Sequence, residues 1–483
     1  MAYEPVIGLE VHVQLKTVSK MFCGCATGFG GAPNSHTCPV CLGFPGALPV
    51  LNQRALTGSI RVAVAVGCKI SDKITFHRKN YFYPDLPKDY QISQYDEPLS
   101  EHGHLKIKIS GGEKTIRIKR VHMEEDAGKL IHEEGGDSSF VDFNRSGMPL
   151  LEIVSEPDIN SPEEAYRYLT DLKLLLRYLD VSDCDMEKGS LRCDANISIR
   201  KKGETGLGTK AEVKNMNSFK AVKSALEFEF ERQVKRLETG ERIVQETRLW
   251  DPDREITVSM RSKEEAHDYR YFPEPDLVPF MLQNDLIEME RKNLPELPGA
   301  RKARFASAFG LPEYDAEVLT QEKETADYFE ECLEFYDKPK IISNWLMGDV
   351  SGYLNAKNLS VRNSKLRPQG LAGLLKEVDS GKISGKMAKD IIIEMLDTGE
   401  DAGVIISEKG LAQISDSGEL DKVSEEVIAE NRKTAEDFLK GKDNALMFLV
   451  GQVMKRTKGK ANPAVVNRIL RDKLTKKQGE EDA

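Results

Sequence analysis

One short stretch of the chain, residues 9–14, alternates strictly between apolar and polar side chains. Successive side chains of an extended strand point to opposite faces, so one face of this stretch carries only apolar groups. The other face carries a carboxylate, an imidazole and an amide, from Glu10, His12 and Gln14. The pattern predicts a strand whose apolar face lies in a core. Its polar face fits either an ordinary solvated surface or a functional site.

Three later stretches, residues 121–126, 149–154 and 192–199, repeat this arrangement of polar groups among apolar neighbours. Glu152 lies within an otherwise apolar run, and buried carboxylates are costly unless they are paired or bind a cation. Oxygen ligands with one imidazole suit Mg²⁺ or Mn²⁺, ions that commonly hold the phosphates of a nucleotide. The repetition therefore favours a functional site over a solvated face.

The order of strand and helix signals predicts an α+β fold. Residues 105–119 alternate around a glycine turn, which predicts an antiparallel hairpin. Helices are expected over residues 161–179 and 218–240, each beginning at a serine that can cap it. Long strands with two packed helices predict a domain built on an antiparallel sheet.

The length of 483 residues is too great for one compact domain. A proline pair near residue 295 marks a change from strand-rich to helical patterns. We therefore expect a catalytic domain over 1–292, a helical domain over 293–406 and a helical tail over 407–483.

Four of the eight cysteines cluster, as Cys23-x-Cys25 and Cys38-x-x-Cys41. The chain shows no export signal, so this spacing predicts a tetrahedral zinc site rather than disulfides. Four thiolates leave no open coordination position, and the zinc is therefore expected to be structural.

Two loops, residues 78–90 and 260–276, combine tyrosines, prolines and charged groups. They fit either packed surface loops or the walls of an active site that meets a nucleotide and an RNA end.

Charge separates the tail from the rest of the chain. The whole chain carries a formal charge of −10, which argues against a uniformly basic nucleic-acid coat. Residues 440–477 instead hold eleven Lys or Arg and two acids. Such a segment is either a solvated surface or a site for a polyanion, and its local excess favours the polyanion. With no apolar run long enough for a membrane span, we expect a cytoplasmic protein without a membrane partner.

Several motifs together resemble the B subunit of the bacterial aspartyl/glutamyl-tRNA(Asn/Gln) amidotransferases. The segments that carry the resemblance are LEVHVQ (9–14), KNYFYPDLPK (79–88), EEDAGK (124–129), DFNRSGMPLLEI (142–153), VKNMNSF (213–219) and the tail segment 444–460. The resemblance implies a cradle-shaped catalytic domain like that of glutamine synthetase and the guanido kinases. It also implies a tail similar to YqeY-like proteins.

The activity implied by this resemblance is that of an ATP-dependent carbon–nitrogen ligase. Glutamate on misacylated Glu-tRNA(Gln), or aspartate on Asp-tRNA(Asn), is phosphorylated on its side-chain carboxylate and then amidated. Ammonia comes through a tunnel from a partner amidase, the A subunit, and the small C subunit makes the assembly a heterotrimer. The chain itself has no Gly/Ser-rich amidase stretch, which fits a protein that receives ammonia from a partner.

The resemblance also implies roles for particular residues. The expected Mg²⁺ (or Mn²⁺) ligands are Glu10, His12, Glu125 and Glu152, and Lys79 and Lys88 are expected to join them in catalysis. From residue type and placement alone, Lys79, Lys88, Arg192 and Lys214 are candidates for contacts to phosphate or the acyl phosphate, and cofactor contacts are also expected from Tyr81 and Asp194. Phosphoryl transfer to a carboxylate brings two anions together, so cations of these kinds are required.

Two other functions compete with this interpretation. A free-standing synthetase of a small amide is disfavoured by the basic tail and by the lack of an ammonia-generating motif. A tRNA-binding scaffold without catalysis is disfavoured because it gains nothing from carboxylates within apolar strands.

Overall fold

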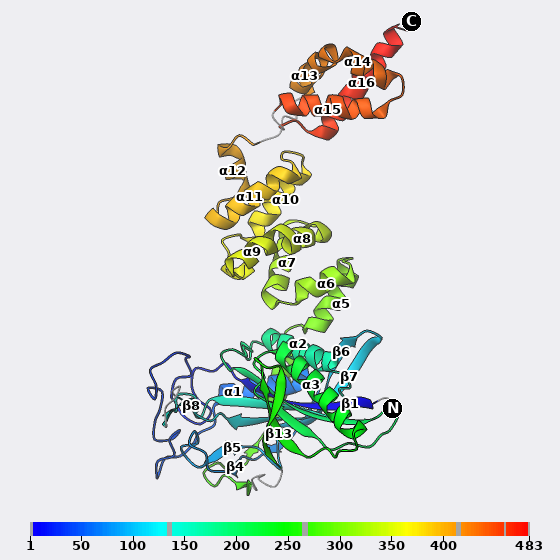
Figure 1. The fold of residues 1–483 in the computed structure, drawn as a ribbon. Coiled ribbons are helices and arrows are strands. Elements are labelled where there is room, and N and C mark those ends of the chain that lie inside the picture. The colour runs from blue at the N-terminus through cyan, green and yellow to red at the C-terminus, as the bar shows by residue number, and fades with distance from the viewer. Residues whose placement is uncertain (1–2, 133–137, 263–268, 412–416, 458–459, 482–483) are drawn as a thin grey trace. The chain divides into compact units, whose positions relative to one another are not determined.

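Strand β1 (Tyr3–Gln14) lies in the middle of a large mixed sheet (Figure 1). The structure is a computed structural model that describes residues 3–132, 138–262, 269–411, 417–457 and 460–481. It separates into two compact units, Met1–Leu297 and Pro298–Ala483. The predicted three-part division of the chain, with boundaries after residues 292 and 406, stays a prediction.

The first unit is organised by its main sheet, in which the described strands lie in the order β14-β13-β12-β11-β1-β10-β7-β6-β2. Smaller sheets join β15, β4 and β5, then β16 and β3, and then β8 and β9. The remaining strands are β2 (Lys69–Ile70), β3 (Lys73–Ile74), β4 (His77–Asn80), β5 (Tyr90–Ser93), β6 (Ser100–Ile109), β7 (Gly112–Glu125), β8 (Lys129–His132), β9 (Ser139–Asp142), β10 (Pro149–Ser155), β11 (Leu191–Lys201), β12 (Ala211–Lys214), β13 (Glu246–Asp251), β14 (Ile256–Ser262), β15 (Phe272–Pro273) and β16 (Phe280–Met281).

One strand pair departs from the antiparallel arrangement that the sequence predicts. Strands β12 and β13 are parallel, whereas the other pairs within the described residues are antiparallel. The physical reason is helix α3 (Phe219–Glu238), which connects them, because a parallel pair needs a long crossover rather than a tight turn. The predicted hairpin is present as β6 and β7.

Helices α1 (Gln53–Ala65), α2 (Pro162–Tyr178) and α3 supply apolar side chains to the same buried cluster as the sheet. The first turn of α2 forms as the sequence predicts: the Ser161 hydroxyl accepts a hydrogen bond from the Glu164 N–H at 3.1 Å, and Pro162 follows the cap. Ser218 caps α3 in the same way, at 3.0 Å from the Ala221 nitrogen. These helices bury the apolar face of the sheet, which leaves the polar face of β1 for a site.

The second unit is helical and contains two separate clusters of buried apolar residues, one from Phe305 to Ile406 and one from Leu420 to Leu474. Among the described residues, no helix has both the length and the apolar character needed to cross a membrane. The helices from α4 onward are α4 (Asn284–Lys292, in the first unit), α5 (Pro298–Ala308), α6 (Glu313–Thr320), α7 (Lys323–Phe335), α8 (Pro339–Trp345), α9 (Ser351–Lys357), α10 (Pro368–Asp379), α11 (Gly385–Thr398), α12 (Ala402–Glu408), α13 (Ser417–Glu430), α14 (Arg432–Leu439), α15 (Asp443–Arg456) and α16 (Pro463–Glu481).

Candidate active site

Strand register places His12 at the centre of the polar face. In the antiparallel ladders, His12 lies opposite Glu152 of β10 and opposite Arg192 of β11. Glu152 in turn lies opposite His122 of β7. Directly opposite residues point to the same face of a sheet, so four strands contribute to one row of polar side chains.

Three of these strands bring together a group that has the composition of a cation site. His12, Glu124 and Glu152 each offer a ligand atom, and these atoms all lie within 4.8 Å of one another. The His12 Nε2 atom is 3.4 Å from a Glu152 oxygen and 3.7 Å from a Glu124 oxygen. His122 lies beside the group on the same face, with its Nε2 3.2 Å from Glu152. We call His12, Glu124 and Glu152 the cation trio.

The cation trio is largely buried, and the pKa values of His12 and Glu152 are shifted by burial and by their charged neighbours. Burial alone would lower the pKa of His12, but its hydrogen bond to Glu152 and the nearby carboxylates raise it to about 9. Burial alone would raise the pKa of Glu152, yet His122 and His12 hold it well below its usual range. The site therefore requires positive charge beside its carboxylates.

A divalent cation fits this arrangement. Two carboxylates and one imidazole form a donor set that suits Mg²⁺ or Mn²⁺. Two buried polar atoms of the same face, Arg192 Nε and Asn196 Oδ1, lack a hydrogen-bond partner among the described residues. Such atoms point to a ligand that completes the site.

Glu125 is not brought to the trio, although the sequence analysis expected it there. It points to the opposite side of β7, where its buried carboxylate accepts hydrogen bonds from Lys88 Nζ and, at 2.9 Å, from the Ile92 N–H. Its neighbour Glu124 takes the expected place because consecutive strand residues face opposite sides. Because Lys88 pairs with Glu125, it also lies away from the trio. The expectation that Glu125 and Lys88 join the cation site is therefore wrong for both residues.

The alternation of side chains along the sequence distinguishes Glu124 from Glu125. Val121 and Met123 are apolar and buried, so Glu125 shares their face, whereas His122 and Glu124 share the polar one. Applying strict alternation to residues 121–125 would have selected Glu124.

Glu10 lies on the correct face of β1 but outside the trio. Its carboxylate accepts a hydrogen bond from Asn196 Nδ2 at 2.9 Å. Burial raises its pKa, and the nearby carboxylates of Glu152, Glu212 and Asp194 raise it further.

Two ion-pair groups adjoin this row. Lys214 Nζ of β12 lies 2.6 Å from Asp194 and 3.0 Å from Glu212. Arg192, which belongs to the row itself, places its Nη2 2.5 Å from Asp126, directly after β7. The predicted contact residues Asp194, Arg192 and Lys214 are therefore all present on the polar face. Asp126 was not predicted as a site residue, although its position directly after β7 could have indicated it.

A lysine and several tyrosines border the trio. The Lys79 Nζ lies 4.9 Å from the centre of the Tyr269 ring and 5.9 Å from that of Tyr81. Burial alone would lower the pKa of Lys79, but Glu124 and the tyrosines raise it above its ordinary value. Lys79 is therefore a fixed cation at the edge of the site. Residues 263–268 of the second predicted loop lie outside the described residues.

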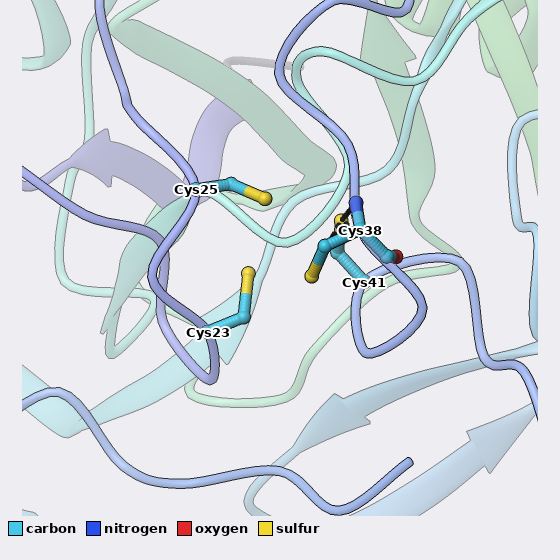
Figure 2. A group of neighbouring side chains, drawn as sticks. All are labelled: Cys23, Cys25, Cys38 and Cys41. Carbon is cyan, nitrogen blue, oxygen red and sulfur yellow. Dashed lines mark hydrogen bonds between the residues drawn. The ribbon is translucent and has the colours of Figure 1, made fainter.

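The four clustered cysteines also come together. Figure 2 shows Cys23, Cys25, Cys38 and Cys41 turned toward one another, and their sulfur atoms all lie within 4.8 Å. All eight cysteines of the chain are free of disulfides. The Cys38 and Cys41 sulfurs are 3.9 Å apart, close to the edge of about 3.8 Å in a tetrahedron with Zn–S bonds of about 2.3 Å.

The surroundings of the cluster favour a thiolate at Cys41, whereas the hydrogen bond to Cys41 raises the pKa of Cys23 and burial raises the pKa of Cys25. A hydrogen bond from Cys23, with smaller contributions from the Cys38 backbone and Lys20, lowers the pKa of Cys41 to about 4. Lys20 is fully buried, and its Nζ lies 3.7 Å from the Cys41 sulfur. The cluster therefore fits a structural metal ion, for which zinc is the expected choice.

Comparison with known proteins identifies the family. Residues 5–288 match the model described as GatB/GatE catalytic domain, and residues 327–474 match the model described as GatB domain. The aspartyl/glutamyl-tRNA(Asn/Gln) amidotransferase B subunit of Carboxydothermus hydrogenoformans is 55% identical over 98% of this chain and 99% of its own length. The proteins of the same name from Caldanaerobacter subterraneus subsp. tengcongensis and Thermoanaerobacter sp. are 57% and 56% identical, each over 99% of this chain and 100% of their own length.

The chain belongs to the family of aspartyl/glutamyl-tRNA amidotransferase B subunits. The resemblance drawn from the sequence motifs is thereby confirmed. Both the trio and the cysteine cluster lie within the part of the chain that matches the family's catalytic domain. The match to the second family model begins in α7 and ends within α16, so it covers the basic segment up to residue 474.

Proposed function

We propose that this chain is the ATP-dependent component that activates and amidates the amino acid of a misacylated tRNA. The substrates are Glu-tRNA(Gln) and Asp-tRNA(Asn), and the products are Gln-tRNA(Gln) and Asn-tRNA(Asn). The observation that carries the proposal is the cation trio on the polar face of the sheet, with Lys79 beside it. The names of its relatives support the same reaction.

In the first step, a side-chain carboxylate oxygen of the esterified amino acid attacks the γ-phosphorus of ATP. The bond to the bridging oxygen breaks, ADP leaves, and an acyl phosphate forms. Mg²⁺ or Mn²⁺ held by His12, Glu124 and Glu152 would supply positive charge to the phosphate oxygens. Lys79 adds a fixed cation, and the Lys214 and Arg192 pairs bring further cations to the same face.

In the second step, ammonia attacks the acyl carbon, the carbon–oxygen bond to the phosphate breaks, and inorganic phosphate leaves. The nitrogen loses one proton, and an amide remains. The acyl phosphate is sensitive to water, so the tyrosines around Lys79 are assigned the role of limiting solvent access. Ammonia is supplied through a tunnel from the amidase partner (the A subunit), and the heterotrimer is completed by the small C subunit.

The other parts of the chain serve this reaction indirectly. The four cysteines hold a structural Zn²⁺, and the basic tail binds tRNA through its phosphates. A cytoplasmic location follows from a role in protein synthesis. The catalytic domain is proposed to be cradle-shaped and like glutamine synthetase, with a YqeY-like tail.

The test is ATP cleavage by the assembled amidotransferase. Phosphate release should depend on Glu-tRNA(Gln) and should not occur with uncharged tRNA(Gln). Glu124→Gln should abolish this release. Phosphate release that is independent of the charged tRNA would contradict the proposal.

A further inference from the structure

A cavity of about 630 Å³ lies at the end of β1, separate from the residues assigned above. Gln14, Phe29, Arg145, Met148 and Ser190 are among its lining residues. Met148 directly precedes β10, and Ser190 directly precedes β11, so the cavity lies where β1 ends and its two neighbours begin. Its volume falls within the range of about 300–1,000 Å³ that is usual for ligand sites.

The cavity continues the polar face that carries the trio. Gln14 shares a face with His12, two residues earlier on β1. A strand rises about 3.3 Å per residue, so the two positions are separated by about 6.6 Å along the strand. A ligand that enters beside Gln14 can therefore reach the trio along one strand.

An exposed aromatic ring stands at the cavity. Phe29 lines it and is 83% exposed, within the segment Gly28-Phe29-Gly30-Gly31. An added side chain at Gly28 or Gly30 would meet nothing within 4 Å, so the backbone on either side of Phe29 in the sequence is uncrowded. A freely exposed ring between glycines is suited to stack on the unpaired base of a single-stranded RNA end.

Cations line the same cavity. The side chains of Lys16 and Lys188 are 66% and 54% exposed, and Lys129 is also exposed. Of the lining carboxylates, Asp142 accepts hydrogen bonds from the Asn34 and Asn144 backbone N–H groups, both at 2.9 Å. Asp183 accepts one from the Ser190 hydroxyl. These two acids are thus occupied by their own loops, whereas the third lining carboxylate, Glu187, is exposed. Lys16 pairs with Asp180 at 2.8 Å and Lys188 with Asp185 at 3.3 Å, and both lysines also reach solvent, as Lys129 does. A phosphate would therefore meet Lys129 and compete with these carboxylates for the other two lysines.

We infer that this cavity receives the single-stranded, aminoacylated 3′ end of the tRNA, with Phe29 stacking on one of its bases. The inference rests on the proposed function and adds the binding site of its RNA substrate. From the ester oxygen to the side-chain carboxylate carbon, an extended glutamyl group spans about 6 Å. A terminal ribose beside Gln14 therefore places that carboxylate at the trio, and an aspartyl group is shorter by only about 1.3 Å.

The nucleoside of ATP is the competing occupant. The other border of the trio already offers a fixed cation between tyrosine rings, at Lys79, Tyr81 and Tyr269. That border suits a base with attached phosphates, which leaves the cavity for the RNA end.

The experiment is a thermodynamic cycle that combines two changes, Phe29→Ala in the protein and removal of the unpaired 3′ nucleotides from the tRNA. The measured quantity is the affinity of each tRNA for the assembled amidotransferase. Base stacking on an aromatic ring predicts that Phe29→Ala weakens binding of intact tRNA by about 5- to 150-fold. The truncated tRNA should bind the variant and the wild type equally. Phe29→Trp should restore binding, and the KM for ATP should stay unchanged.

Phe44→Ala is the matched control, because Phe44 follows Cys41 closely in the sequence, is 56% exposed and does not line this cavity. It should bind both tRNAs as the wild type does. Equal loss of affinity for intact and truncated tRNA in Phe29→Ala would overturn the inference, as would a raised KM for ATP with tRNA binding intact. Failure of the proposed reaction is read separately, from phosphate release, because these binding measurements need no catalysis.

Discussion

The adjacent residues Glu124 and Glu125 should have opposite phenotypes when each is changed to glutamine. Glu124 belongs to the trio, whereas Glu125 pairs with Lys88 on the other side of the same strand. The substitution is isosteric, so each variant removes one negative charge and little volume. Differences between the two variants therefore report which face each side chain serves.

Glu124→Gln should mainly weaken binding of the metal ion. Changing outer-shell partners of a metal ligand costs about 10- to 100-fold in affinity, so removing a charged ligand should cost at least about 100-fold, or about 2.7 kcal/mol. The fold should persist, because the amide oxygen can still accept the hydrogen bond that Ser93 Oγ donates at 3.1 Å.

Glu125→Gln should mainly lower the stability of the folded protein. Lys88 and Glu125 are 6% and 4% exposed at their side chains, so the variant leaves a buried ammonium without its partner. Breaking a buried pair in this way costs about 3–5 kcal/mol of unfolding free energy. Its metal affinity should stay within a few-fold of the wild type.

The assays are Mn²⁺ titration followed by electron paramagnetic resonance and thermal unfolding of the same samples. Phosphate release dependent on charged tRNA provides the functional readout. If Glu125→Gln lost Mn²⁺ and Glu124→Gln retained it, the assignment of faces would be refuted, and a ligand set with Glu125 in place of Glu124 would be favoured.

Three further outcomes are expected. Metal analysis should find one zinc per chain, and Cys23→Ser should lower the zinc content; a metal-free protein would exclude the site. Removing the chain after Ser407 should raise the KM for tRNA, leave turnover at saturating tRNA intact and flatten the salt dependence of binding; equal salt slopes would exclude a tRNA role for the tail. Burial alone would raise the pKa of Asp315, but Lys340 and Ser343 hold that pKa below its ordinary value. The charged carboxylate therefore stabilises the folded state above about pH 5. This stabilisation is lost as the pH falls through the folded-state pKa of Asp315. The difference in unfolding temperature between wild type and Asp315→Asn should shrink over that acidic range, and a constant difference would contradict this assignment.

Periodicity predicted local structure well because it reports which side of an element is buried. The alternation of residues 9–14 placed His12 on a polar face, and the apolar run around Glu152 marked a carboxylate held within a sheet. The spacing of the clustered cysteines predicted a shared site, and the fold brings their four sulfurs within 4.8 Å of one another.

What periodicity could not supply is the pairing between distant segments. Alternation can select Glu124 over Glu125, but only the register that sets Glu152 opposite His122 brings Glu124 and Glu152 beside each other. The parallel pairing of β12 with β13 depends on how α3 packs, which neither strand records. Lys79 reaches the trio from β4, a strand outside the main sheet, so no pattern within its own segment indicates that contact.

The cysteine cluster and the cation trio are connected through one tight segment, which gives the structural metal a consequence for the chemistry. The Gly147 N–H donates to the Asp126 carbonyl at 2.8 Å, directly after β7, and the Gly147 carbonyl accepts from the Met21 N–H at 2.8 Å. Gly147 has φ +82°, and a side chain there would meet Cys41 Cβ at 3.4 Å and Lys20 Cδ at 3.5 Å. The loop that carries the cysteines is thus bonded, through Met21, to the segment between β7 and β10, the two strands that carry Glu124 and Glu152. A zinc bound by these cysteines would therefore help to fix the spacing of two carboxylates without touching substrate, and fixed spacing lets a site stabilise charge without reorganising during the reaction.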